Sequence, residues 1–220
     1  MISPDGASYV SQDTATIEIG DARTGTVLRS IPPGNYDSVI AYTATGIYAY
    51  HTGEQVIPGL WKIDPSTGRV TQLQSSSTPV NWSLVDDNVA WGTYTTPDNV
   101  TAVMRLDLST GVMTNIYQPA GQHDAAVVGL VGSGVMVVVE SFGNAGLVSA
   151  IVVNDDGSTA PVAVPGTLLD KTFTHRLQDG SAIIFSGLGY GVAAYDPDHG
   201  LQLLIDTPQD MFLLGRCRPQ

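Results

Sequence analysis

The chain has 220 residues, with 9 Lys or Arg against 21 Asp or Glu, so its formal net charge at pH 7 is −12. This charge repels nucleic acids and anionic membrane surfaces, which excludes both as partners. Charged residues make up 14% of the chain and hydrophobic residues 43%, with 24 Gly and 13 Pro. That balance is typical of a turn-rich all-β protein and excludes a disordered chain or a helical bundle.

Residues 1–6 contain no basic segment followed by an apolar one, so the sequence does not open with a secretion signal. The longest apolar run, 134–139, is rich in β-branched residues and far too short to span a membrane, so it predicts a strand and no membrane insertion. The lone cysteine, Cys217, excludes an intrachain disulfide framework and a multi-cysteine zinc site. The compartment stays unknown, and an extracytoplasmic location is open if an export signal lies upstream of Met1.

A turn recurs five times in which an apolar segment ends at Asp or Asn and Gly follows shortly. Its leading residues are Asp21, Asp64, Asp107, Asn154 and Asp196, at intervals of 43, 43, 47 and 42 residues. The Asp or Asn oxygen can accept backbone N–H bonds within the loop, and Gly takes the positive-φ position. We therefore expect a β-hairpin at each copy.

A second turn precedes the first by about 15 to 22 residues in every repeat. Its copies lie at 3–6, 44–46, 86–88, 132–134 and 178–180. Together the turns divide the second repeat into strands at 38–42, 46–50, 60–63 and 69–73, and the third into strands at 80–84, 88–92, 102–106 and 112–116. Four short strands every 40 to 50 residues are the signature of a β-propeller blade.

The Asp-x-x-Thr-Gly turns and the Ser3-Pro4-Asp5-Gly6 turn resemble the bacterial β-propeller repeats of the TolB-like and YVTN type, and more loosely the WD-repeat. The resemblance covers essentially the whole chain and implies a fold rather than an activity, because propellers with unrelated activities share these turns. The Trp-Asp dipeptide of WD-repeats is absent from the sequence, which disfavours that subtype.

The expected fold is an all-β propeller of four-stranded antiparallel blades in a single domain, residues 1–220, with five blades. We expect the blades at about 1–32 plus 211–217, 36–74, 80–117, 125–164 and 172–206. Segment 211–217 would pair with the strand at 7–10, complete the first blade and close the ring. The alternative is that the chain is the C-terminal part of a larger propeller whose earlier blades lie upstream of Met1.

The resemblance implies a ligand face formed by the loops that join second to third strands and one blade to the next. These loops are 51–55, 95–99, 141–144 and 187–191 within blades, and 34–37, 121–124 and 206–210 between blades. Their imidazoles and carboxylates are suited to a divalent cation or to acid–base chemistry, although exposed loop residues of this type usually only solvate the surface. The candidate ligand-binding residues there are Asp37, His51, Glu54, His123 and Asp124.

Two further candidates, His175 and Arg176, lie in an expected innermost strand at 173–177, so strand alternation points one of them toward the central channel. Arg176 could hold an anion there or neutralise neighbouring carboxylates. The sequence contains no Gly-x-Ser-x-Gly elbow, no phosphate-binding loop and no EF-hand pattern. We therefore assign no catalytic residue, no metal site and no cofactor.

The sequence is compatible with two functions. The first is a non-catalytic scaffold that presents a loop-lined face to a protein or a small ligand. The second is an enzyme, either a metal-assisted propeller lyase or the gating domain of a hydrolase.

Overall fold

The computed structural model describes residues 1–13, 16–32, 34, 38–51, 58–75, 78–121, 123–141, 146–169, 171, 175–179, 182–187 and 191–207. At His175, Arg176, Asp179 and Gly187 the description is limited to the backbone. Within these residues the regular structure consists of strands and one 3-10 turn, η1 (Gly166–Leu168). No helix in the described part of the chain is long and apolar enough to cross a membrane.

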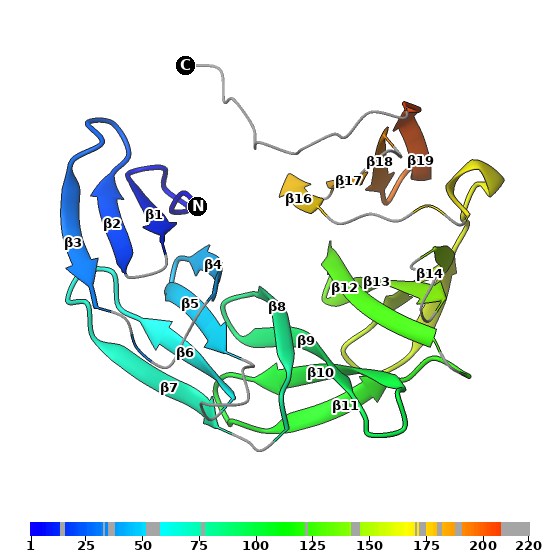
Figure 1. Cartoon of the computed structure of the whole chain (residues 1–220), viewed down its shortest axis with the longest axis horizontal. Helices are drawn as coiled ribbons and strands as arrows, with labels where there is room; N and C mark the ends of the chain where they lie inside the picture. Colours follow the sequence, from blue (N-terminus) through cyan, green and yellow to red (C-terminus); the bar gives the residue numbers. More distant parts are fainter. Residues whose placement is uncertain are drawn as a thin grey trace. The chain divides into compact units, whose positions relative to one another are not determined.

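The strands form five antiparallel sheets that follow one another along the chain, and they can be traced by colour in Figure 1. The first sheet contains β1 (Ser8–Gln12), β2 (Ile17–Asp21) and β3 (Val27–Ile31). The second contains β4 (Ser38–Thr43), β5 (Gly46–His51), β6 (Gly59–Ile63) and β7 (Val70–Ser75). The third contains β8 (Asn81–Val85), β9 (Val89–Thr95), β10 (Thr101–Asp107) and β11 (Met113–Tyr117).

The last two sheets repeat the same order of strands. The fourth contains β12 (His123–Val131), β13 (Gly134–Ser141), β14 (Leu147–Val153) and β15 (Thr159–Val162). The fifth contains β16 (His175–Asp179), β17 (Ala182–Gly187), β18 (Gly191–Asp196) and β19 (Gly200–Ile205). Each strand pairs with its neighbours in sequence, so every sheet is the up-and-down meander of a propeller blade. This confirms the predicted fold class.

The predicted strands of the second and third blades agree with the observed ones to within a few residues at each end. Both kinds of predicted turn lie between the expected strands. In the first blade the described residues form three strands, as the turn at 3–6 had indicated.

The chain divides into two compact units, which we describe separately. The N-terminal unit is Met1–Tyr94 with Met104–Thr114, and the C-terminal unit is Thr95–Val103 with Asn115–Gln220. The core of the N-terminal unit includes Ile17, Ile47 and Ile63, which are almost completely buried. Met136, Leu168 and Ile183 occupy the equivalent place in the C-terminal unit.

The middle strands of the blades are buried on both faces. In β5 the four residues from Gly46 to Ala49 are all buried, whereas the outermost strand of that blade, β7, has no fully buried residue. A strand covered on both faces reads as a continuous apolar run, which explains the sequence of β13. Trp82 and Trp91 are at most 2% exposed, which supports a packing role for them over a surface stacking platform.

Residues 1–3 lie along the inner edge of β1. Val10 N–H donates to the Met1 carbonyl at 2.8 Å, and Ser3 N–H donates to the Ser8 carbonyl at 2.9 Å. The Met1 amino group donates to the Val10 carbonyl at 2.7 Å. The inner edge of β1 is therefore paired at Ser8 and Val10. Segment 211–217 lies outside the described residues, so ring closure stays a prediction.

Candidate functional site

The connections fall into two groups at opposite ends of each sheet. One end, which we call the turn end, carries the connections from first to second and from third to fourth strand of the four-stranded sheets, and in the first sheet it carries residues 3–6 and the β2–β3 turn. The other, the loop end, carries the connections from second to third strand and from one blade to the next.

The turn end is held by hydrogen bonds to aspartate. In the β6–β7 turn, Asp64 Oδ1 accepts bonds from Ser66 N–H at 2.8 Å, Ser66 Oγ–H at 2.6 Å and Thr67 N–H at 3.1 Å.

The same bonds recur in the β10–β11 turn, where Ser109 and Thr110 donate to Asp107. The Ser66 hydroxyl and the backbone N–H groups of Thr67 and Ser66 hold the pKa of Asp64 at about 2. The Ser109 hydroxyl and the backbone N–H groups of Thr110 and Ser109 hold the pKa of Asp107 at the same value. These carboxylates are therefore ionised, and each is hydrogen-bonded within its own turn. This confirms the hairpin chemistry predicted from the repeat.

Three predicted site residues have described side chains at the loop end. His51 is the last residue of β5, is half-buried, and has a buried Nε2 atom. His123 begins β12, with its Nδ1 atom 2.8 Å from the Ala120 carbonyl oxygen. The next residue, Asp124, accepts a 2.8 Å bond from Thr101 Oγ–H, and Thr101 is 3% exposed. The structure thus joins Asp124 to the start of β10 in the preceding blade.

The remaining predicted site residues cannot be placed at the level of their side chains. Asp37 and Glu54 lie outside the described residues. The backbones of His175 and Arg176 begin β16, opposite Ser186 and Phe185 of β17, but their side chains are outside the description. Among the described residues no three His, Cys, Asp or Glu side chains gather in a way that could hold a metal ion. The proposed loop-end site therefore stays a prediction.

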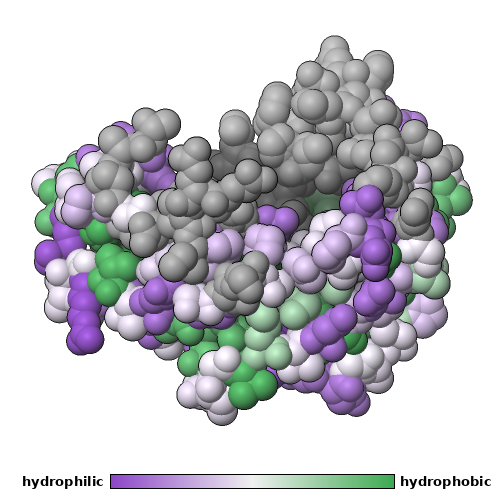
Figure 2. Space-filling view, turned by 60° about the horizontal axis from the view of Figure 1, so that its bottom comes forward, coloured by the Kyte–Doolittle hydropathy of each residue, from purple (hydrophilic) through white to green (hydrophobic). Residues whose placement is uncertain are grey.

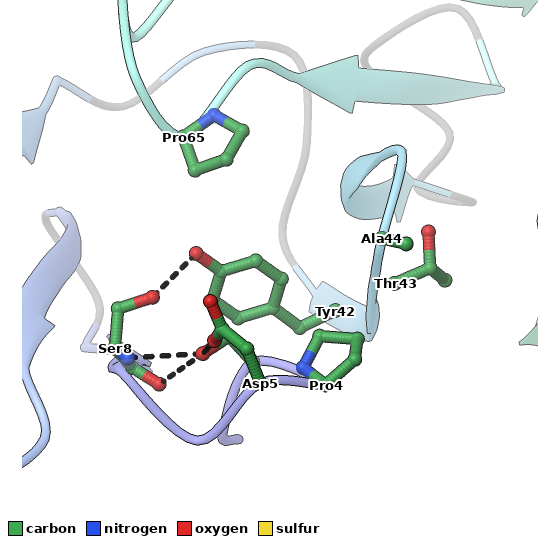
Figure 3. Close-up of a pocket in the computed structure, with 8 residues that line it drawn as sticks. Pro4, Asp5, Ser8, Tyr42, Thr43, Ala44 and Pro65 are labelled. Atoms are coloured by element: carbon green, nitrogen blue, oxygen red, sulfur yellow. Dashed lines mark hydrogen bonds between the residues drawn. The ribbon is translucent and has the colours of Figure 1, made fainter.

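Sequence reasoning did not identify a pocket at the turn end of the N-terminal unit, between the first and second sheets. Its volume is about 280 Å³. Figure 3 shows Tyr42 between Pro65 on one side and Asp5 and Pro4 on the other. The pocket is lined by Ser3, Pro4, Asp5, Ser8, Tyr42, Thr43, Ala44 and Pro65. The Ser3-Pro4-Asp5-Gly6 motif supplies three of these residues, whereas its sequence predicts only a turn.

Among the described residues, half of the exposed large hydrophobic side chains lie on outermost strands, for example Val27 and Leu28 on β3 and Val70 on β7, and the others are scattered over the chain. On the face drawn in Figure 2, hydrophobic residues form several small groups separated by hydrophilic ones. Small, separated groups of this kind are ordinary on a protein surface. The ends of the blades are therefore better candidates for function than this surface.

Comparison with known proteins supports a fold but no family. No protein-family model matches the chain, and no curated protein sequence is similar to it. Among solved structures, TolB from Acinetobacter baumannii is similar with a TM-score of 0.65 and 19% identity, over 92% of this chain and 53% of that one. An oligogalacturonate lyase in complex with manganese is similar with a TM-score of 0.68 and 13% identity, over 94% of this chain and 64% of that one.

A putative TolB from Agrobacterium tumefaciens is similar with a TM-score of 0.66 and 14% identity, over 93% of this chain and 79% of that one. At these identities the likeness establishes the fold alone, which is a TolB-like β-propeller. The chain spans about half the length of the Acinetobacter protein and less than two thirds of the lyase.

Proposed function

We propose that the chain is a non-catalytic β-propeller scaffold whose loop end presents a binding surface to a protein or a small ligand. The observation that carries the proposal is the contrast between the two ends of the blades. At the turn end, the three hairpins led by Asp21, Asp64 and Asp107 repeat one sequence, Asp-x-x-Thr-Gly, and one hydrogen-bond pattern. The connections at the loop end share no motif and differ in length, from 52–58 between β5 and β6 to 188–190 between β17 and β18. A regular frame with variable loops at one end is a common arrangement for recognition.

Side-chain bonds between neighbouring blades support a rigid frame. Gln178 of β16 pairs with both backbone groups of Leu130 in β12, accepting from its N–H at 2.8 Å and donating to its carbonyl at 3.0 Å. In the N-terminal unit, Gln12 Oε1 accepts a 2.7 Å bond from Val39 N–H. Such bonds hold the innermost strands, and with them the starts of the loops, in defined positions.

The third blade offers a matched pair of exposed aspartates for a test. Asp98 lies in the β9–β10 connection at the loop end, and Asp87 lies in the β8–β9 turn at the other end of the same strand. A photo-crosslinking amino acid is placed at either position in the full chain, expressed in its native cells. We expect a specific adduct from position 98 and none from position 87. Equal labelling at the two positions, or none at position 98, contradicts the proposal.

The metal-assisted lyase is the competing function, because one structural relative is described as an oligogalacturonate lyase in complex with manganese. The purified chain is incubated with Mn²⁺, dialysed, and assayed for bound metal and for cleavage of oligogalacturonate. His51→Ala and His123→Ala are assayed beside it. The scaffold proposal predicts neither stoichiometric metal nor cleavage. Stoichiometric metal or cleavage that either substitution abolishes replaces it with the lyase.

A further inference from the structure

The turn-end pocket combines a carboxylate, hydroxyl groups and apolar rings in one small space. The Tyr42 hydroxyl lies 2.7 Å from Ser8 Oγ and so connects β4 of the second blade to β1 of the first. The rings of Pro4 and Pro65 and the methyl group of Ala44 supply the apolar part of the lining. Figure 3 shows the Tyr42 side chain extending into the space between the two prolines. The pocket therefore has an apolar wall beside a polar one.

The polar wall carries a fixed negative charge. Asp5 Oδ1 accepts a 2.7 Å bond from Ser3 Oγ–H and a 3.0 Å bond from Ala7 N–H. Both bonds go to the same oxygen, so they orient the carboxylate while leaving Oδ2 outside these two contacts. The Ser3 hydroxyl, followed by the Ala7 N–H, lowers the pKa of Asp5, which is therefore ionised at neutral pH. The lining residues include no Lys, Arg or His to balance this charge.

We propose that this pocket binds an alkylammonium group, with the ammonium against Asp5 and the alkyl chain against Tyr42, Pro4 and Pro65. A carboxylate and an aromatic ring both attract a cation, and an alkylammonium chain has the apolar body that the proline rings would cover. The net charge of −12 favours the same class of ligand. A lysine side chain of a partner protein and a free diamine share this chemistry. The pocket lies at the end of the blades opposite the proposed loop-end surface, so the inference is independent of that proposal.

The test uses nuclear magnetic resonance titration of the full chain, with the amides of Ala7 and Ser8 as reporters. The probes are Nα-acetyl-lysine-methylamide, cadaverine, and Nα,Nε-diacetyl-lysine-methylamide, which has nearly the same shape as the first but no charge. We expect saturable shifts with the two charged probes, with dissociation constants in the millimolar range, and none with the uncharged one. The tighter of the two charged probes identifies the source as a protein lysine or a free amine.

Three variants locate the binding. Asp5→Asn keeps an oxygen that can accept the Ser3 and Ala7 bonds but removes the charge, and we expect at least fivefold weaker binding. Ala44→Lys places a competing ammonium on an exposed turn residue of the pocket, and it should abolish the shifts. Asp21→Asn removes the same charge from another turn of the first sheet and should bind as the parent chain does. Equal binding of the uncharged probe, unchanged binding by Asp5→Asn and Ala44→Lys, or equal weakening by Asp21→Asn overturns the proposal.

Discussion

A single carboxylate oxygen organises each Asp-x-x-Thr-Gly hairpin. Asp21, Asp64 and Asp107 all accept bonds from the two residues that follow them by two and three positions. This repetition explains why aspartates at nearly constant intervals in the sequence predict the propeller fold. It also explains part of the acidic composition, because these aspartates stabilise turns and need no partner outside the chain.

These turns make the protein sensitive to acid. The pKa of Asp64 and Asp107 is about 2 in the folded chain, against an ordinary value of 3.8. As the pH falls from about 4 to about 2, the unfolded chain binds protons before the folded one, so stability present above pH 4 is progressively lost. We expect the double variant Asp64→Asn and Asp107→Asn, which keeps the accepting oxygens but cannot titrate, to show a smaller fall of melting temperature over this range. Thermal unfolding followed by circular dichroism at several pH values measures it.

The double variant Asp87→Asn and Asp98→Asn is the control for net charge, since it removes two carboxylates from positions outside the Asp-x-x-Thr-Gly turns. Its melting temperature should fall with pH as steeply as that of the parent chain. If the two double variants have the same pH dependence, the hydrogen-bonded turns are not the origin of the acid sensitivity.

At the scale of the strands, close contact between neighbours sets the tolerance to substitution. In β9, a Cβ atom added to Gly92 would lie 2.5 Å from the Asn81 carbonyl oxygen and 2.9 Å from the Trp82 Cα atom. In β12, a Cβ atom added to Gly129 would instead meet the terminal methyl group of Ile183. A backbone obstacle cannot move without disturbing the pairing of β8 with β9, whereas a side chain can change its rotamer.

Gly92→Ala should therefore destabilise the chain by about 3 kcal/mol and Gly129→Ala by about 1 kcal/mol. Urea unfolding of both variants gives the two free energies. The reverse order, or equal costs, would show that the backbones of β8 and β9 can separate at this point without loss.

Bonds between blades belong to the same scale, and the side-chain amide of Gln178 makes two of them to Leu130. Gln178→Leu removes both bonds, so the N–H and carbonyl groups of half-buried Leu130 lose this partner. We therefore expect the free energy of unfolding to fall by about 2 kcal/mol. Gln202→Leu in the same sheet is the control, because Gln202 makes one exposed bond, to the His199 carbonyl. Its cost should stay below about 0.5 kcal/mol. Similar costs for the two variants would mean that the Gln178 bonds do not join the blades energetically.

At the scale of the whole molecule, the sequence predicted the fold well because the fold is built from local repeats. Asp64 and Gly68, or Thr43 and Gly46, are close in sequence, and each such pair marks one hairpin. The turn-end pocket was missed because Asp5, Tyr42 and Pro65 come together only when two sheets pack, and nothing in their spacing shows it. The bond from Thr101 to Asp124 likewise joins two blades, and the spacing of these residues in the sequence does not show it.

Ring closure is the remaining prediction at this scale. A strand formed by 211–217 is expected to complete the first blade beside β1. A chain shortened to residues 1–210 should then melt about 5 °C lower, which corresponds to about 2 kcal/mol for a protein of this size. Thermal unfolding of the full and the shortened chain measures the difference. Unchanged melting would exclude this closure and favour the larger propeller.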